Sequence, residues 1–320
     1  MRRTFRDRWG RGSCPPAEGA ERSRHARAVA QALLVTFLWS TSWVLIKRGL
    51  VEIPPLTFAG LRYALAFLLL VPAVWVRRRE VRTLPTRETA RIAVLGVVLY
   101  ALTQGGQFLT LAHLEATTLS LVLSMTAIVV GLAGTRGRES PRPIQWLGMA
   151  LAAGGSAAYF APGRAEAGHA LGYALAAATL TANAAASLLG RRVNRDATVP
   201  PVVVTALSMG AGALILLAAG LVLDGIPVLS LRSWAIIAWL AVVNTAFAFT
   251  LWNRTLQTLS AVESTVLNNT MLVQIALLAW LFLGETRGLI EWLGLGLVAG
   301  GTALVQFRPR GRRSRNAAPT

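Results

Sequence analysis

Neutral polar and aromatic side chains interrupt the long apolar segments of this sequence, and these residues are the best suited to bind a ligand. In lipid, an amide or a hydroxyl group needs a hydrogen-bond partner or a wet cavity. Such side chains either line a cavity that holds a small solute or bond neighbouring helices together. A single Ser or Thr favours the second role, whereas Asn and Gln spread over several segments favour a cavity. The candidate substrate-binding residues are Trp39, Ser40, Trp43, Gln104, Gln107, Ser120, Ser124, Asn183, Asn244, Thr245, Phe249, Trp252, Asn268 and Asn269. Helical spacing of i, i+4 and i+7 also predicts that Thr245, Phe249 and Trp252 share one helix face.

Residues for other kinds of chemistry are scarce. None of the 14 acidic residues lies in the middle of a long apolar segment, which weakens any case for proton coupling through a buried carboxylate. The nearest, Glu263, is better explained as a favourable charge at a helix start. With three His and one Cys, Cys14, the chain has no predicted metal site. It also has no hydrolase motif and no phosphate-binding loop, so we expect neither an enzyme nor a bound cofactor.

Arg62 is the one basic residue clearly inside an apolar segment. Two interpretations stay open for it. Its side chain could extend along the helix so that the charge reaches the lipid headgroups, or it could lie at the mouth of the cavity.

The elements that must position these residues are ten apolar segments. The 320-residue chain is 54% hydrophobic and 14% charged, whereas soluble domains carry about 25% charged residues. Segments of about 17–25 apolar residues are long enough to cross a bilayer as helices. The composition therefore predicts an all-α polytopic membrane protein with ten transmembrane helices, and it excludes a soluble nucleic-acid binder despite the net charge of +18. The segments are 29–46, 56–76, 92–111, 117–135, 144–160, 171–189, 201–223, 234–252, 264–283 and 289–307. Proline at 54–55, 141, 143 and 200–201 marks predicted helix starts, where a missing N–H costs little.

The charges predict how the chain is oriented. Most of its 32 Lys and Arg residues fall on one side if the N-terminus is cytoplasmic, which is a strong positive-inside signal. An even number of helices places both termini on that side. We therefore expect a disordered basic cytoplasmic arm at 1–27 and a basic cytoplasmic tail at 308–320.

An internal repeat divides the chain. The stretch Trp146-Leu147-Gly148 recurs as Trp292-Leu293-Gly294, and the same offset of 146 relates residues 153–157 to residues 299–303. The two copies lie five helices apart, on the fifth and the tenth predicted helix. Because five is odd, the halves, 28–160 and 168–307, would enter the membrane with opposite polarity, which is a recurrent plan of secondary transporters. Small residues four apart in the repeated helices predict close helix packing: Ala150, Gly154 and Ala158 in one, Gly296 and Gly300 in the other.

Short signatures across residues 30–307 resemble the drug/metabolite transporter superfamily, in its EamA-type branch. They are WSTSWVLIK at 39–47, IPP at 53–55, LRY at 61–63, WLA at 239–241, TA at 245–246, LWNR at 251–254, LFLGE at 281–285 and WLG at 292–294. The resemblance implies two inverted five-helix repeats around a central cavity, lined by the first, third, fourth, sixth, eighth and ninth helices, with the fifth and tenth peripheral. Two features of the family pattern are missing. The proline usual in the fourth and ninth helices is absent near Met125-Thr126 and Met271-Leu272. In the first half, Arg138-Glu139 replaces the usual Gly-Glu pair.

The resemblance also implies a function. Such proteins move amino acids, amines and other small molecules, often outward. We therefore expect a secondary transporter of the cell (inner) membrane that exports a small organic solute by alternating access. Its partners would be the solute and the lipid bilayer, and a homodimer is compatible with this. The missing carboxylates favour facilitated diffusion without ion coupling as a second hypothesis. A non-transporting membrane scaffold or assembly factor is the alternative from another class.

Overall fold

The computed structural model describes residues 17–126, 129–130, 143–159, 170–196, 200–225, 227–255, 258–259, 261–286 and 288–306. Within these ranges the regular structure is helical, without a β-strand. The helices are α1 (Ala17–Gly49), α2 (Pro55–Val76), α3 (Arg78–Arg82), α4 (Thr86–Gly96), η1 (Val97–Gln104), α5 (Gly105–His113), α6 (Ala116–Ser124), α8 (Pro143–Tyr159), α9 (Ala170–Asp196), α10 (Pro201–Asp224), α11 (Leu231–Ala241), η2 (Val242–Phe247), α12 (Ala248–Thr255), α13 (Ala261–Leu283) and α14 (Leu289–Gln306). Helices α2, α8 and α10 begin at the expected prolines.

Six helical segments in the described ranges are long and apolar enough to cross a membrane. They are Ser23–Gly49, Pro55–Val76, Thr86–His113, Ala170–Gly190, Val202–Asp224 and Leu231–Trp252. Thr270–Leu283 and Leu289–Leu304 are shorter apolar helices. Over its described residues the chain is therefore all-helical, and its apolar helices make it a multi-pass membrane protein. Part of the expected segment 117–135 lies outside the described residues, as do Cys14, Glu139 and the tail at 308–320.

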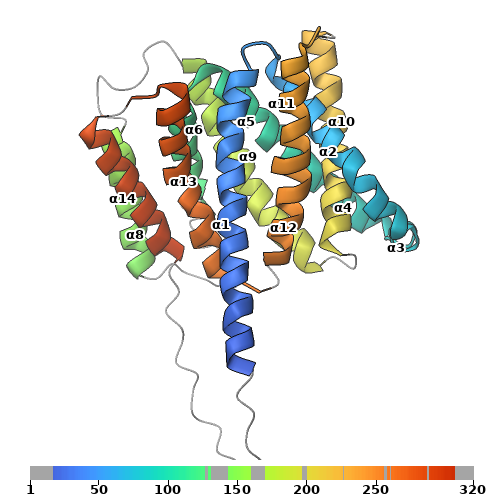
Figure 1. Cartoon of the computed structure of the whole chain (residues 1–320), viewed down its shortest axis with the longest axis horizontal. Coiled ribbons are helices and arrows are strands. Elements are labelled where there is room, and N and C mark those ends of the chain that lie inside the picture. The colour runs from blue at the N-terminus through green and yellow to red at the C-terminus, as the bar shows by residue number, and fades with distance from the viewer. Residues whose placement is uncertain are drawn as a thin grey trace, which may run out of the picture.

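Helix α1 starts earlier than the sequence predicts. The stretch 1–27 was expected to be a disordered arm, but the helix already begins at Ala17. Ala, Glu and Arg dominate the residues that extend it, and these residues have high helix propensity. The extension projects below the bundle (Figure 1).

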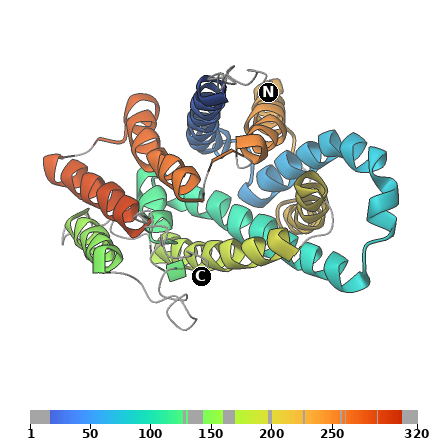
Figure 2. The ribbon, with the colours of Figure 1, turned by 90° about the horizontal axis from the view of Figure 1, so that it is seen from below.

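The helices form a bundle in which two pairs pack most closely. Helix α8 lies along α14 at one side, and α2 lies along α10 at the other (Figures 1 and 2). Helix α1 contacts α13 on one flank and α11, η2 and α12 on another. Helix α9 contacts η1 and α5. Elements from the two halves of the sequence are thus interleaved throughout the bundle.

The α8–α14 pair packs backbone against backbone. A Cβ atom at Gly155 would lie 2.6 Å from the carbonyl oxygen of Gly294, and one at Gly301 would lie 2.5 Å from that of Gly148. The offset of 146 converts the first of these contacts into the second. The close packing predicted for these helices is confirmed, but the predicted face is wrong. A Cβ at Gly154, Gly296 or Gly300 would meet nothing within 4 Å, because the contact lies on the neighbouring face of each helix.

Two long helices contain π-helical segments at similar places in the two halves. Segment η1 continues α4 into α5, and η2 continues α11 into α12. In each, a threonine hydroxyl donates to the carbonyl five residues earlier: Thr103 Oγ1 to Val98 at 2.8 Å and Thr245 Oγ1 to Leu240 at 2.9 Å. Such segments often mark functional sites. They also change which side chains share a helix face, and this matters for the cavity.

Candidate functional site

A cavity of about 510 Å3 lies inside the bundle. Its volume is within the range of about 300–1,000 Å3 that is usual for small-molecule sites. Side chains from α1, α2, η1, α5, α6, α9, α12 and α13 line it, together with Thr302 of α14. The resemblance implied most of these helices, but α2 and α14 are additions. Nine predicted candidates line the cavity: Trp39, Trp43, Gln104, Gln107, Ser120, Ser124, Asn183, Phe249 and Asn268. That these residues bind a solute remains a prediction.

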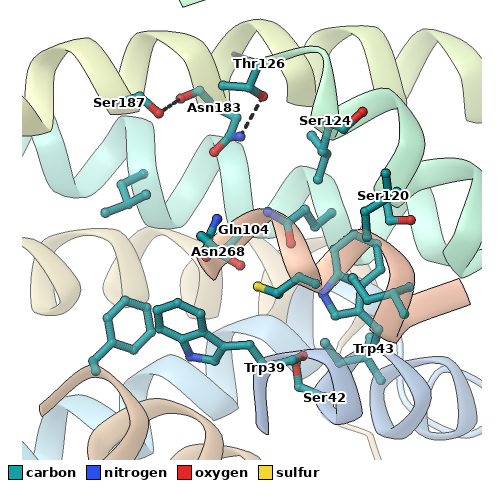
Figure 3. Close-up of a pocket in the computed structure, with 18 of the residues that line it drawn as sticks. Trp39, Ser42, Trp43, Gln104, Ser120, Ser124, Thr126, Asn183, Ser187 and Asn268 are labelled. Atoms are coloured by element: carbon teal, nitrogen blue, oxygen red, sulfur yellow. Dashed lines mark hydrogen bonds between the residues drawn. The ribbon is translucent and has the colours of Figure 1, made fainter. Parts of the chain in front are cut away.

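Aromatic rings form one wall. The ring centroid of Trp39 lies 5.1 Å from that of Phe249 and 5.2 Å from that of Trp252, both in tilted geometry. The Trp39 indole N–H donates to the backbone oxygen of Asn244 at 3.1 Å. The indole is therefore held from two sides, and its remaining surface faces the cavity beside Trp43 (Figure 3).

Amide side chains form the polar part of the lining. Asn183 donates to the hydroxyl of Thr126 at 2.9 Å (Figure 3), and Gln104 accepts from the Tyr63 hydroxyl at 2.9 Å. Within the described ranges, the side chains of Gln107 and Asn268 form no hydrogen bond to another residue. Both side chains are half-buried, and an amide in such a position normally finds a partner. These two therefore have donors and acceptors to offer to a solute or to water.

The serine hydroxyls are oriented by their own helices. Ser120 donates to the Thr117 carbonyl at 2.8 Å, and Ser124 donates to that of Leu121 at 2.6 Å. Ser42, which is not among the predicted candidates, donates to the Trp39 carbonyl at 2.6 Å. Each hydroxyl proton is thus used locally, so these oxygens can offer the cavity only acceptor lone pairs.

Three other candidates hold helices together beside the cavity. Ser40 of α1 donates to Gln274 of α13 at 3.0 Å. Asn244 of η2 is fully buried and donates to the Leu38 carbonyl and, at 3.3 Å, to the Thr41 hydroxyl. Thr245 is fully buried against α2. Trp252 contacts Trp39 behind the lining, and the side chain of Asn269, like that of Glu263, lies outside the described part.

The expected common face of Thr245, Phe249 and Trp252 is not present. Thr245 contacts α2, whereas Phe249 and Trp252 contact α1. The reason is the π-helical segment η2, which ends between them at Phe247. A π turn uses i to i+5 spacing, so side chains four apart no longer align.

The sequence left two interpretations of Arg62 open, and the structure decides between them. The residue is only 4% exposed, so the headgroup interpretation is wrong. It lines the cavity, and among the described lining residues it alone is charged. The cavity lining also includes residues that are not among the predicted candidates, namely Tyr63, Thr126, Ser187 and Met271. Tyr63 follows Arg62 and Thr126 stands at a missing proline, and these were the signals available for them.

Charged side chains hold the helix ends at one end of the bundle. Lys47 Nζ donates to the carbonyls of Leu111 and Leu114 at 2.7 and 2.6 Å, at the end of α5. Glu285 accepts from the start of α6. Nearby, hydrogen bonds from Ser230 and Ser233 lower the pKa of Glu52 below its usual 4.5. Charges of these signs at these helix ends are favourable.

A family model matches the chain twice, over residues 26–161 and 170–307, and its description is EamA-like transporter family. The chain belongs to the EamA-like transporter family. The resemblance seen in the sequence is therefore confirmed. This family and the relatives below are transporters and not enzymes.

The chain is similar to the uncharacterized inner membrane transporter YedA of Escherichia coli (strain K12), with 26% identity over 286 residues, 84% of this chain and 87% of that protein. An uncharacterized transporter of Archaeoglobus fulgidus is 30% identical over 120 residues, 37% of this chain and 41% of that protein. A solved crystal structure matches 87% of this chain and 97% of its own with a TM-score of 0.63 and 20% identity. At that identity the likeness shows the fold alone.

Proposed function

We propose that this EamA-family protein is a secondary transporter that exports a small organic solute across the inner membrane by alternating access. The observation that carries the proposal is the cavity, which is lined by amides from both family-matched segments. Gln107 belongs to the first and Asn268 to the second, and neither side chain has a partner among the described residues. The E. coli relative is named an inner membrane transporter, which supports the location.

The architecture of this proposal is ten helices in two inverted repeats with cytoplasmic termini. Several observations support it. The offset of 146 relates Pro54-Pro55 to Pro200-Pro201, and it relates the Gly155–Gly294 contact to the Gly301–Gly148 contact. Both halves also carry a π-helical segment. Rocking of one repeat against the other would open a shared cavity first to one side and then to the other.

The lining favours an amphipathic solute. Trp39, Trp43 and Phe249 offer apolar ring surface, while Gln104, Gln107 and Asn268 offer amide groups. The described lining residues include no carboxylate. Because buried carboxylates are the usual proton carriers in transporters, we propose that transport is not proton-coupled. Addition of solute to proteoliposomes should then leave the internal pH unchanged, and solute-driven proton movement would contradict this part of the proposal.

The transport proposal is tested by replacing the free amides. Gln107→Leu and Asn268→Leu should each lower solute counterflow into proteoliposomes roughly two- to tenfold, because each removes one hydrogen bond of about 0.5–1.5 kcal/mol to the solute. Gln31→Leu is the matched control, because Gln31 is an α1 amide outside the cavity. The test solutes are amino acids, amines and nucleobases.

The outcomes separate the two classes of function. Lower flux in both cavity variants, with an unchanged melting temperature and a normal Gln31→Leu protein, supports transport. If the wild-type protein moves none of these solutes under any gradient, the proposal fails. Loss of a partner complex in the cavity variants, without any flux in the wild type, would instead support the scaffold alternative.

A further inference from the structure

Arg62 is a buried cation in the wall of the cavity. It lies in α2, one of the membrane-spanning candidates, and 4% of its surface is exposed. An ionisable side chain inside a membrane-spanning segment is costly and marks a functional site by default. It therefore needs a compensating interaction.

The contacts of Arg62 fix its guanidinium group without neutralising it. Its Nε donates to Thr245 Oγ1 at 3.0 Å. The Thr245 hydroxyl donates onward to the Leu240 carbonyl at 2.9 Å, so that oxygen is available as an acceptor for Arg62. The guanidinium carbon lies 5.2 Å from the ring centroid of Tyr63 and 5.9 Å from that of Phe108. Rings at these distances attract the cation.

The two terminal nitrogens of the guanidinium take no part in these contacts. A guanidinium has five N–H donors in a planar fork, and Arg62 uses only the one on Nε in a hydrogen bond within the described ranges. No carboxylate described in the structure lies within ion-pair distance of it. The two terminal nitrogens therefore have no anionic partner from the described chain, although the residue lines the cavity.

We infer that Arg62 is the binding subsite for a carboxylate group of the transported solute. A carboxylate matches the two parallel donors of the fork in a bidentate geometry. A carboxylate also matches the single charge of the subsite. A doubly charged phosphomonoester would need further cations, and the described lining supplies no other charged side chain.

The neighbouring lining fits the rest of such a solute. Tyr63 is held by its hydrogen bond to Gln104, so the ring beneath the guanidinium keeps its position. The free amide of Gln107 can accept from an ammonium or hydroxyl group of the solute. Apolar surface from Trp43, Met271 and Ile275 lines the same cavity. The substrate class is therefore an amphipathic molecule with one carboxylate. This inference rests on the proposed transport function.

The test compares matched probes on wild-type protein and on Arg62 variants. The probes are L-leucine, 4-methylpentanoate (a carboxylate without the amine), L-leucinamide (an amine without the carboxylate) and inorganic phosphate. Binding at millimolar concentration is measured by thermal shift of the purified full chain, and flux is measured by counterflow. Arg62→Gln removes the charge, Arg62→Lys keeps the charge without the fork, and Arg192→Gln is the control because Arg192 is exposed and outside the cavity.

We expect the wild type to bind the two carboxylates more tightly than leucinamide and phosphate. Arg62→Gln should weaken carboxylate binding about tenfold or more, because charge-assisted hydrogen bonds are lost. The same variant should change leucinamide binding by less than about twofold. Arg62→Lys should fall between Arg62→Gln and the wild type, and Arg192→Gln should match the wild type.

Three results would overturn the inference. The first is that neither carboxylate stabilises the wild type. The second is that phosphate or leucinamide binds best. The third is that Arg62→Gln lowers carboxylate and leucinamide binding equally in folded protein, which assigns Arg62 a structural role. Failure of the transport proposal looks different, because the carboxylates would then bind in an Arg62-dependent way without any flux.

Discussion

Glu285 links the end of the chain to the beginning of a helix in its first half. It lies between α13 and α14 and is 6% exposed. Its carboxylate accepts the backbone N–H of Ala116 at 2.8 Å, the backbone N–H of Thr117 at 3.2 Å and the Thr117 hydroxyl at 2.7 Å. These groups lie in the first turn of α6, the helix that supplies Ser120 and Ser124 to the cavity. Glu115, the N-cap residue of α6, makes no side-chain capping bond, so Glu285 provides the cap from a distance.

The contribution of Glu285 to the free energy of unfolding can be worked out from these contacts. A hydrogen bond to a charged group is worth about 1.5–3 kcal/mol, and loss of a helix cap costs about 0.5–2 kcal/mol. The three bonds share one carboxylate, whose own burial is unfavourable, so their energies do not add. We expect Glu285→Ala to lower the free energy of unfolding by about 3 kcal/mol, because it leaves three donors without their acceptor. Glu285→Gln keeps one acceptor oxygen and should cost about half as much.

The measurement is reversible denaturant unfolding in mixed micelles. The matched control is Glu291→Ala, because among the described residues the Glu291 side chain accepts one hydrogen bond, from the exposed backbone N–H of Gly288, directly before its own helix α14. That change should cost at most about 1 kcal/mol. If Glu285→Ala lies within about 0.5 kcal/mol of the wild type, or costs no more than Glu291→Ala, the capping argument is refuted.

Two further predictions concern packing and pH. Gly155→Ala should lower the free energy of unfolding by about 1–3 kcal/mol, because its Cβ would lie 2.6 Å from the Gly294 carbonyl oxygen. Gly154→Ala should be neutral or stabilising, because its Cβ would meet nothing within 4 Å. If both variants lower the free energy of unfolding equally, the assigned packing face is wrong. Ser230 and Ser233 lower the pKa of Glu52, so this contact stabilises the fold above pH 4.5 and is lost as the pH falls through the lowered pKa. The melting-temperature difference between wild type and Glu52→Gln should therefore disappear in acid, and a difference that grows there would contradict the assignment.

The helices could be predicted because the signal for them is local. An apolar segment long enough to cross a membrane can be recognised from its composition. The offset of 146 related the helix that contains Trp146 to the helix that contains Trp292. Most candidate cavity residues were found in the same way, because a neutral amide in an apolar segment is conspicuous. Local signals fail where neighbours decide. For Gly154 and Gly155, composition alone does not tell which glycine faces α14, and the rotation of α8 settles it.

The amides show the same division. The sequence by itself determined that Gln107, Asn244 and Asn268 need partners or a cavity, because lipid offers no hydrogen bonds. Only the tertiary structure decided whether each of these amides bonds to a neighbouring helix or faces the cavity. The side-chain amide nitrogen of Asn244 donates to α1, about two hundred residues away in sequence, while its Oδ1 is buried without a partner among the described residues. Gln107 and Asn268 line the cavity instead. A π-helical segment also shifted the faces of the helix that carries Thr245.

Arg62 is the sharpest case. The sequence placed one cation inside an apolar segment, and from its own helix alone two environments were equally compatible with it. The fold brought Thr245, Tyr63 and Phe108 around the guanidinium and no described carboxylate. The type of a residue and its local helix follow from the sequence, because they depend on near neighbours. Whether a buried charge is paired depends on groups that only the packing of distant helices brings together.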